Sequence, residues 1–300
     1  MTRLPPLLQN RLEATARSYL EAPGFNVDFT EPRGAEALIA ANSLTWRVMK
    51  NPVALVVGGI AAVILELAEP RVRTGVWQHT SFRRDPVTRM RRTGYAAMVT
   101  VYAPADAARA MIAGVARAHE RISGETPAGA AYRANDEALL NWVHATAGFG
   151  FFEAYSRFVR PLSRADMDML FAEGAVGAGL YGAHGAPRSA DEMDALFKAM
   201  APALERSDII FEFLGIVRRA PLLPWKRLQS LMIRGAVEIT PAWARERLGL
   251  GPSYGFKPGY ESLLHMMGAA ADTLVIESAP PSQACLRMGL AADYLYRPRP

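Results

Sequence analysis

The sequence predicts an all-α protein, a large helical bundle built around a buried central helix. Signals that begin helices recur along the chain, among them the capping patterns at 163–166 and 189–192. Alternation of apolar and polar residues is short or missing; only 95–102 could form a strand, and it fits a helix equally well. With 300 residues, 50% of them hydrophobic and 21% charged, the chain can bury a large core.

The first 67 residues contain two helical patterns, one amphipathic and one apolar on all sides. Residues 1–20 have the pattern of an amphipathic helix without an unbroken apolar stretch, so we expect no signal peptide and a cytoplasmic location. Residues 52–67 are apolar on all sides but fall short of the roughly 20 residues that span a membrane. We therefore expect a buried central helix and no transmembrane segment. Gly58 and Gly59 would allow close approach of a neighbouring helix or a flat ligand.

Later helices have clear starting signals and one expected break. Acidic residues at 136–137 fit a first turn, and Thr240 followed by Pro241 fits an N-cap and a first helical residue. The glycine-rich stretch 174–187 is the expected boundary between a larger amino-terminal bundle and a carboxy-terminal helical set. It contains a G-x-G-x-x-G pattern at 177–182. Because a capped helix precedes this pattern instead of a strand, we interpret it as a flexible connection and not a dinucleotide site.

The charge and the cysteine content limit the kinds of site that the chain can form. The net charge of +5 comes mainly from arginine, since only four lysines are present. Most single arginines are expected to be solvated and paired with the 29 acidic residues. The one cysteine, Cys285, excludes an intrachain disulfide and a cysteine-based zinc or iron–sulfur centre, and we expect it to be a small core residue.

A dense group of arginines precedes two histidines on apolar helix faces. His119 continues the stripe formed by Ile112 and Val115 on a helix predicted over 104–122, and His144 lies on the apolar face of the next long helix. Either histidine alone is more often a hydrogen-bonded core residue. Next to the arginine cluster, the pair instead indicates a site where an anionic group lies against a histidine ligand. The cluster consists of Arg71, Arg73, Arg83, Arg84, Arg89, Arg91 and Arg92.

The remaining histidines are weaker candidates. His79 lies in a segment with the composition of a loop, His184 lies in the glycine-rich stretch, and His265 precedes two methionines in a helix. No pair has the close spacing of a zinc enzyme. The arginine cluster could also bind nucleic acid, but it is interrupted by Asp85 and lacks interleaved exposed aromatic residues and a recognition helix, so no nucleic-acid partner is expected.

Four motifs occur in the order known from one protein family. They are GVWQHTSFRRDPVTRMRRT, HERISG, YRANDEALLNWVHAT and ITPAWARERLGL. Together they resemble the MpaB/rubber-oxygenase (latex clearing protein-like) family, over about residues 51–250. The resemblance implies an all-helical fold with an internal pocket for haem b, an iron-bound histidine, and O2-dependent cleavage of carbon–carbon double bonds.

The resemblance also implies roles for single residues. His119, with Gly124 five positions later, occupies the place of the family's axial iron ligand, and His144 would contribute to the pocket wall. Two arginines that flank the ligand in the family are replaced here by Ala116 and Ser123. These departures concern the surroundings of the ligand, not the ligand itself.

On the open side of the haem, the family carries an arginine, a lysine and a threonine. The matching residues here are Arg89, Arg92 and Thr93, so an arginine stands in place of the lysine. Its pKa stays above about 12, so it is not an iron ligand. The resemblance implies that Arg92 and Thr93 are catalytic and that Arg89 neutralises a haem propionate.

The residues and the resemblance leave two candidate functions. The first is a haem b-dependent oxygenase acting with O2 on a small apolar or isoprenoid-like substrate. The second is a helical protein that binds haem or a lipophilic ligand without turnover. The expected organisation is a helical extension at 1–50, the catalytic domain at 51–250, and a helical segment at 251–300 that packs on the same core.

Overall fold

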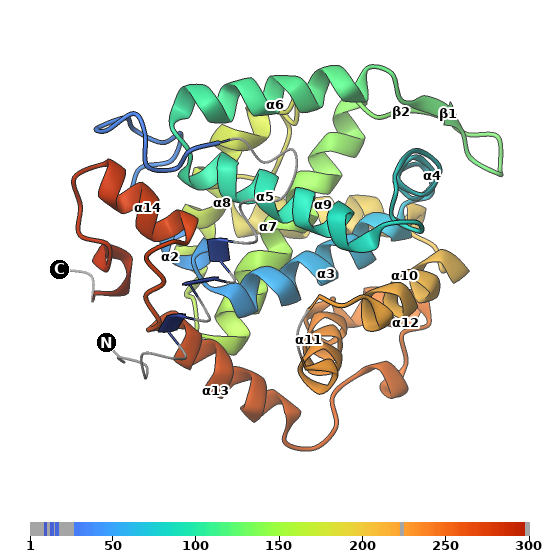
Figure 1. The fold of residues 1–300 in the computed structure, drawn as a ribbon. Coiled ribbons are helices and arrows are strands. Elements are labelled where there is room, and N and C mark those ends of the chain that lie inside the picture. Colours follow the sequence, from blue (N-terminus) through green and yellow to red (C-terminus); the bar gives the residue numbers. More distant parts are fainter. Residues whose placement is uncertain (1–8, 11–12, 15, 18–26, 223–224, 298–300) are drawn as a thin grey trace.

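The structure is a computed structural model that describes residues 9–10, 13–14, 16–17, 27–222 and 225–297 (Figure 1). The amphipathic helix expected over the first 20 residues lies mostly outside this part of the chain. Within it, the fold is helical with one two-stranded sheet. Its α-helices are α2 (Leu44–Met49), α3 (Pro52–Ala68), α4 (Pro70–His79), α5 (Pro86–Tyr102), α6 (Ala105–His119), α7 (Glu137–Phe158), α8 (Arg164–Leu180), α9 (Ala190–Met200), α10 (Asp208–Arg219), α11 (Lys226–Ile239), α12 (Ala242–Leu248), α13 (Tyr260–Asp272) and α14 (Pro280–Arg287). The short elements are the strands β1 (Ser123–Glu125) and β2 (Ala131–Arg133) and the 3-10 helices η1 (Ala201–Ala203), η2 (Pro252–Tyr254) and η3 (Tyr294–Tyr296).

The central buried helix predicted from the sequence is α3, which runs through the middle of the molecule (Figure 1). Asn51 begins it, because its side chain accepts hydrogen bonds from the amides of Val53 and Ala54, and proline follows at the first helical position. The helix packs along α7 and also contacts α11. A β-carbon on Gly58 would lie 2.6 Å from the carbonyl carbon of Gly150, so these two backbones approach as closely as glycines permit.

The interior consists of two large apolar clusters that lie on either side of a boundary. One is formed mainly by α3, α7 and the helices from α8 to α13. The other is formed by α5, part of α2, the segment before α2, and α14. Phe151 on α7 contacts both clusters. Helices α5 and α6 pack on each other, and close backbone contacts between this pair and the α3–α7 pair are few. The boundary therefore separates two helical layers.

Several expected helix signals are confirmed, and others differ from the expectation. Ser163 and Asp166 form a capping box at the start of α8. Ser189 caps α9, but the Glu192 carboxylate accepts from the amide of Arg188 and so does not close a second box. Residues 95–102 are helical within α5.

Two expectations were wrong. Thr240 is not an N-cap, because its hydroxyl donates to the carbonyl of Ala236 and ends α11. The stretch 174–187 is not a connection throughout, because α8 continues to Leu180 and only the residues after it leave the helix. Among these, Gly182 has a φ of 90°, which favours glycine and ends the helical path.

The carboxy-terminal helices pack on the same layers as the rest of the chain. Helix α13 contacts α3 and α7, and α14 contacts α5. The buried Lys50 side chain donates to the carboxylate of Asp272 at 2.6 Å, and Tyr155 donates to the other oxygen at 3.1 Å. Cys285 on α14 is fully buried, as expected for a core residue.

No single helix in the described part of the chain is long and apolar enough to cross a membrane. The pair α3 and α4 meets the criteria of length and composition only when taken together, and the two helices meet at an angle of 110°.

Candidate functional site

Three of the four sequence motifs meet at the ring of Tyr132 on β2. Its hydroxyl lies 3.1 Å from Nε2 of His79, and β-carbons on Gly75 or Gly124 would lie 3.3 Å and 2.7 Å from atoms of the tyrosine. The two glycines therefore make room for the ring between α4 and the hairpin. His79, which the sequence placed in a loop, is the last residue of α4. These motif residues fix the local structure directly after His119.

The hairpin also holds the end of α6. The side-chain amide of Asn135 donates to the carbonyl of Ala116 at 3.1 Å, and the amide of Ala134 donates to the carbonyl of Ile122 at 2.9 Å. The first contact is a second hydrogen bond to a carbonyl in the last turn of α6, and the second attaches the segment after the helix to the end of the hairpin. His119 is the last residue of α6 and is partly buried. Its position is therefore determined by helix and hairpin together.

The charge of Arg89 acts on two ionisable groups, His119 and Glu66. Burial lowers the pKa of His119, and the positive charge of Arg89 lowers it further. Burial raises the pKa of Glu66 to about 7, against the opposing influence of Arg89. Burial also lowers the pKa of Arg89, and Glu66 partly offsets this. The three groups come from α6, α3 and α5, so they connect the two layers.

Arg89 is oriented by Thr93, one helical turn further along α5. The threonine hydroxyl donates to the Arg89 carbonyl at 3.1 Å and also contacts the Arg89 guanidinium. Thr93 and Arg92 are exposed, whereas Arg89 is partly buried. Arg92 acts on Arg89 through its charge and also on the carboxylate of Asp85. The catalytic roles of Arg92 and Thr93 stay a prediction.

His144 on α7 lies beside a tyrosine that the sequence did not indicate. Its ring is 4.9 Å from the ring of Tyr181, and burial lowers its pKa to about 4. The Tyr181 hydroxyl lies 3.2 Å from the Thr100 hydroxyl and 3.9 Å from Sδ of Met111. His144 is therefore neutral at physiological pH, and Tyr181, directly after α8, contacts residues of α5, α6 and α7.

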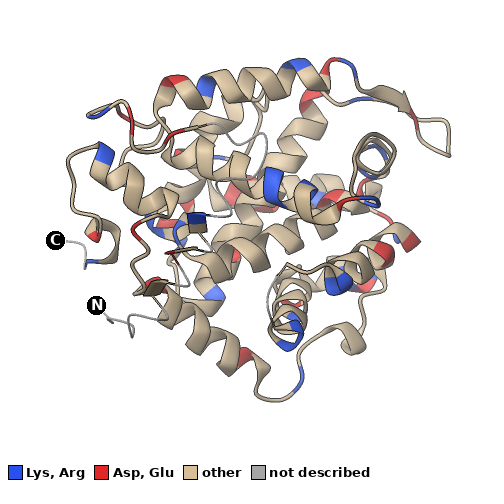
Figure 2. Cartoon of the chain, viewed as in Figure 1, with Lys and Arg blue, Asp and Glu red and all other residues tan. Residues whose placement is uncertain are grey.

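The rest of the arginine cluster has mainly structural contacts. Arg73 is buried and contacts Glu205, while Arg71 pairs with Glu69 at 2.7 Å. Arg83 forms two hydrogen bonds of 2.8 Å with the carboxylate of Glu212 at the surface. Basic residues gather along the first half of α5 (Figure 2). Among the seven arginines of the cluster, Arg89 is the one whose charge acts on His119.

Sequence reasoning missed Glu66 and Tyr181. Glu66 was taken only as the end of an apolar run, although a lone carboxylate inside such a run is itself a signal of a special environment. Tyr181 lies within the G-x-G-x-x-G pattern, and neither spacing nor composition relates it to His144. Contacts between distant helices bring both residues to the site.

Partly buried residues line one face of α3 and one face of α6. On α3 they recur as Gly59, Val63 and Glu66, and on α6 as Met111, Val115 and His119. Fully buried residues occupy the opposite side of α3, such as Val57 and Ile64. The helix faces that carry Glu66 and His119 are therefore packed less tightly than the side chains inside the two apolar clusters.

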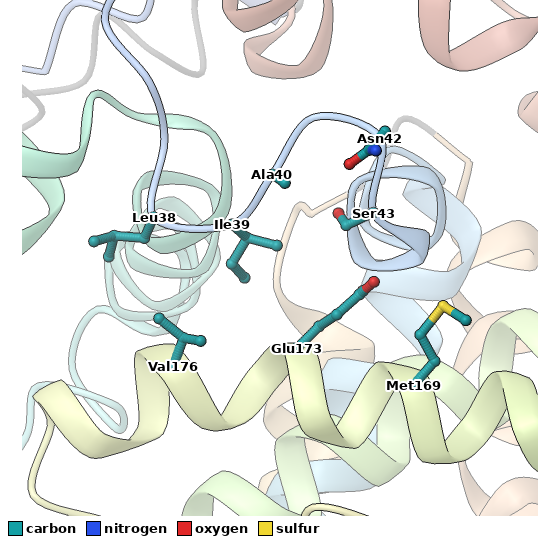
Figure 3. Close-up of a pocket in the computed structure, with 8 residues that line it drawn as sticks. All are labelled: Leu38, Ile39, Ala40, Asn42, Ser43, Met169, Glu173 and Val176. Atoms are coloured by element: carbon teal, nitrogen blue, oxygen red, sulfur yellow. The ribbon is translucent and has the colours of Figure 1, made fainter.

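Two clefts lie at the surface. The smaller, about 340 Å³, lies between residues 38–43 and α8 (Figure 3). Its carboxylate, Glu173, accepts from the amides of Leu44 and Thr45 and therefore serves as a cap for α2. The larger, about 760 Å³, lies beside the first half of α6 and includes Met111.

The other two histidines lie at the surface. His184 and His265 are exposed. In the described part of the chain, no group of three or more histidine, cysteine or acidic side chains is arranged to hold a metal ion. A cofactor that brings its own equatorial ligands would need only one protein ligand.

The fold and site define a mostly helical protein in which a guanidinium, that of Arg89, acts on an imidazole of lowered pKa and on a carboxyl of raised pKa. A family model described as "ER-bound oxygenase mpaB/B'/Rubber oxygenase, catalytic domain" matches residues 46–269. The chain therefore belongs to this family of oxygenases, as the four motifs predicted. Comparisons with curated proteins and with solved structures gave no match.

Proposed function

We propose that the protein is a haem b-dependent oxygenase that uses O2 to cleave carbon–carbon double bonds in an apolar, isoprenoid-like substrate. The observation that carries the proposal is the position of Arg89 on α5, whose charge acts both on His119 of α6 and on Glu66 of α3. Membership of the oxygenase family supports the reaction class.

The residues fit a haem in three respects. His119 has a lowered pKa, and a neutral imidazole is the form that binds iron. Arg89 can neutralise a propionate by charge-assisted hydrogen bonds. Glu66 and His144 are both deep enough for burial to shift their pKa values, yet both keep accessible surface. Side chains that border internal space have this combination of properties.

Each polar residue has a separate task in this proposal. Haem, when bound, supplies the redox chemistry with O2. His119 would hold the iron, and His144 would form part of the wall. Glu66, with a pKa of about 7, can take up a proton at its carboxylate near neutral pH, as a general base must. Arg92 and Thr93 would act on the open side, Thr93 through its contact with Arg89.

The overall reaction is balanced without a further reductant. One double bond and one O2 molecule give two carbonyl groups, so both oxygen atoms enter the products. The test uses the purified protein reconstituted with haemin, squalene as the alkene, an oxygen electrode, and hydrazone formation to detect carbonyl products. We expect oxygen uptake that needs both haem and squalene. Haem binding without uptake or carbonyl products would instead favour a protein that binds haem or a lipophilic ligand without turnover.

A further inference from the structure

The larger surface cleft lies between the first half of α6 and the segment 27–36, which appears in Figure 1 as the blue loop beside the start of α6. Its volume of about 760 Å³ is within the range of small-molecule sites. Val27, Ala107, Ala110 and Met111 provide an apolar surface. A ligand in this cleft reaches the candidate site only if the cleft connects to the surroundings of His119.

The outer wall of the cleft is held in place by hydrogen bonds. The amide of Ala105 donates to the carbonyl of Glu36 at 2.9 Å, which attaches the segment to the start of α6. Arg287 is buried and donates to the carbonyls of Phe29 and Ala35 at 2.9 Å each. Because these hydrogen bonds already hold the wall of the cleft in place, a ligand that binds there pays a smaller entropic cost for ordering it.

One side chain reaches from the cleft to the candidate site. Met111 lines the cleft, and its sulfur lies 3.9 Å from the Tyr181 hydroxyl. The Tyr181 ring in turn lies 4.9 Å from the ring of His144. Methionine is unbranched and adapts its shape readily, so this side chain can move without disturbing the helix.

The geometry of α6 places the cleft and His119 on the same helix face. Met111, Val115 and His119 are spaced by four residues, and residues at this spacing lie one above the other. At 1.5 Å per residue, Met111 and His119 are about 12 Å apart along the axis. The partly buried face therefore runs from the cleft to the proposed iron ligand.

We propose that this cleft is the substrate entrance and that Met111 determines which molecules pass from it to the site. This inference rests on the proposed oxygenase function. The substrate is an uncharged, chain-like apolar molecule, because carboxylates at the rim disfavour a fatty-acid anion. The rim carboxylates are Asp28, Glu31, Glu36 and Asp106.

The first experiment measures binding to the cleft by calorimetry and does not require haem. The probes are 1-decanol and decanoate, which have the same chain length. Binding of 1-decanol should be about fivefold tighter, as expected from one charge repulsion that is screened by water. Ala110→Trp should weaken 1-decanol binding by about tenfold or more because the indole fills the cleft. Ala118→Trp, exposed on the same helix but outside the cleft, is the matched control and should bind 1-decanol as the unaltered protein does.

Equal affinity of the two tryptophan variants for 1-decanol would overturn the cleft assignment. Equal affinity for 1-decanol and decanoate would overturn the assignment of an uncharged substrate. These binding measurements do not depend on haem. If the protein fails to take up haem, the proposed function is refuted, but the measurements still test the cleft.

The second experiment tests Met111 as the passage residue. The association rate of carbon monoxide with the reduced, haem-loaded protein is measured by flash photolysis in the presence of saturating 1-decanol and in its absence. Met111→Trp should slow association by about tenfold, whereas Met111→Leu, of similar volume, should not. Identical rates in both variants, with an unchanged haem spectrum, would overturn the role of Met111 and leave the proposed function intact.

Discussion

The backbone of Gly58 on α3 lies directly against the backbone of Gly150 on α7, where a β-carbon on Gly58 would come within 2.6 Å of the Gly150 carbonyl. Gly59, its neighbour, points instead toward the ring of Phe151, with a β-carbon position 3.8 Å from the nearest ring atom. The first glycine sets the separation of the central helices, and the second lies on the face toward the site.

This difference gives a stability prediction with an internal control. Gly58→Ala should destabilise the protein by about 3 kcal/mol, because the methyl group would force the two backbones apart. Gly59→Ala has room for its methyl group and should be neutral or stabilise by up to about 1 kcal/mol through better helix propensity. Urea unfolding followed by circular dichroism measures both. A Gly58→Ala protein as stable as Gly59→Ala would contradict the packing described.

Glu66 should make stability depend on pH in a defined direction. Its pKa is raised from 4.5 to about 7 in the folded state, so the folded protein prefers the protonated carboxyl. This contribution is fully present below about pH 4.5 and is lost as the pH rises through 7. Relative to Glu66→Gln, the protein should lose about 3 kcal/mol between pH 4 and pH 8. A difference that does not change over this interval would show that Glu66 is not buried in this way.

His144 should act in the opposite direction. Its pKa is lowered from 6.5 to about 4, so the folded protein prefers the neutral ring. The contribution is present above pH 6.5 and is lost as the pH falls toward 4. Relative to His144→Gln, the protein should lose about 3 kcal/mol over that interval. The contributions of Glu66 and His144 to stability change with pH in opposite directions. Comparing the protein with the variant of one residue therefore isolates the contribution of that residue. A constant difference would indicate an ordinary, accessible histidine.

The sequence predicted the fold class and the central helix because both depend on local patterns. The caps at Asn51 and Ser163 and the apolar run of α3 are formed by residues near one another in the chain. The pattern at Thr240 and Pro241 was misread because the same two residues can end one helix and begin the next.

The candidate site was predictable only in part. His119 and Arg89 were found through an apolar stripe and through the family resemblance. Glu66 could not be assigned, because its raised pKa comes from the burial of α3 by helices distant in the chain. Tyr181 reaches His144 only because α8 continues through a glycine-rich stretch that the sequence indicates as a loop.

The two arginines of α5 should differ in a haem-loaded protein. Arg92→Ala should leave haem bound and slow the reaction with O2 by roughly ten- to a thousandfold, as loss of a single electrostatic donor does. Arg89→Ala removes the positive charge that acts on Glu66 and also the proposed propionate contact, so it should weaken haem retention as well. Arg91→Ala, exposed on the same helix, is the control. An Arg92→Ala protein with unchanged oxygen reactivity would remove Arg92 from the site.

The most direct test of the account is a haemin titration of the purified protein followed by absorbance near 400 nm, the usual porphyrin region. The unaltered protein and His184→Ala, a control altered in an exposed loop, should each bind one equivalent of haem tightly. His119→Ala should keep its helical circular dichroism but lose haem, and His144→Ala should retain it. Full haem occupancy in His119→Ala, or loss of haem in His144→Ala alone, would contradict the assignment of His119 as the iron ligand.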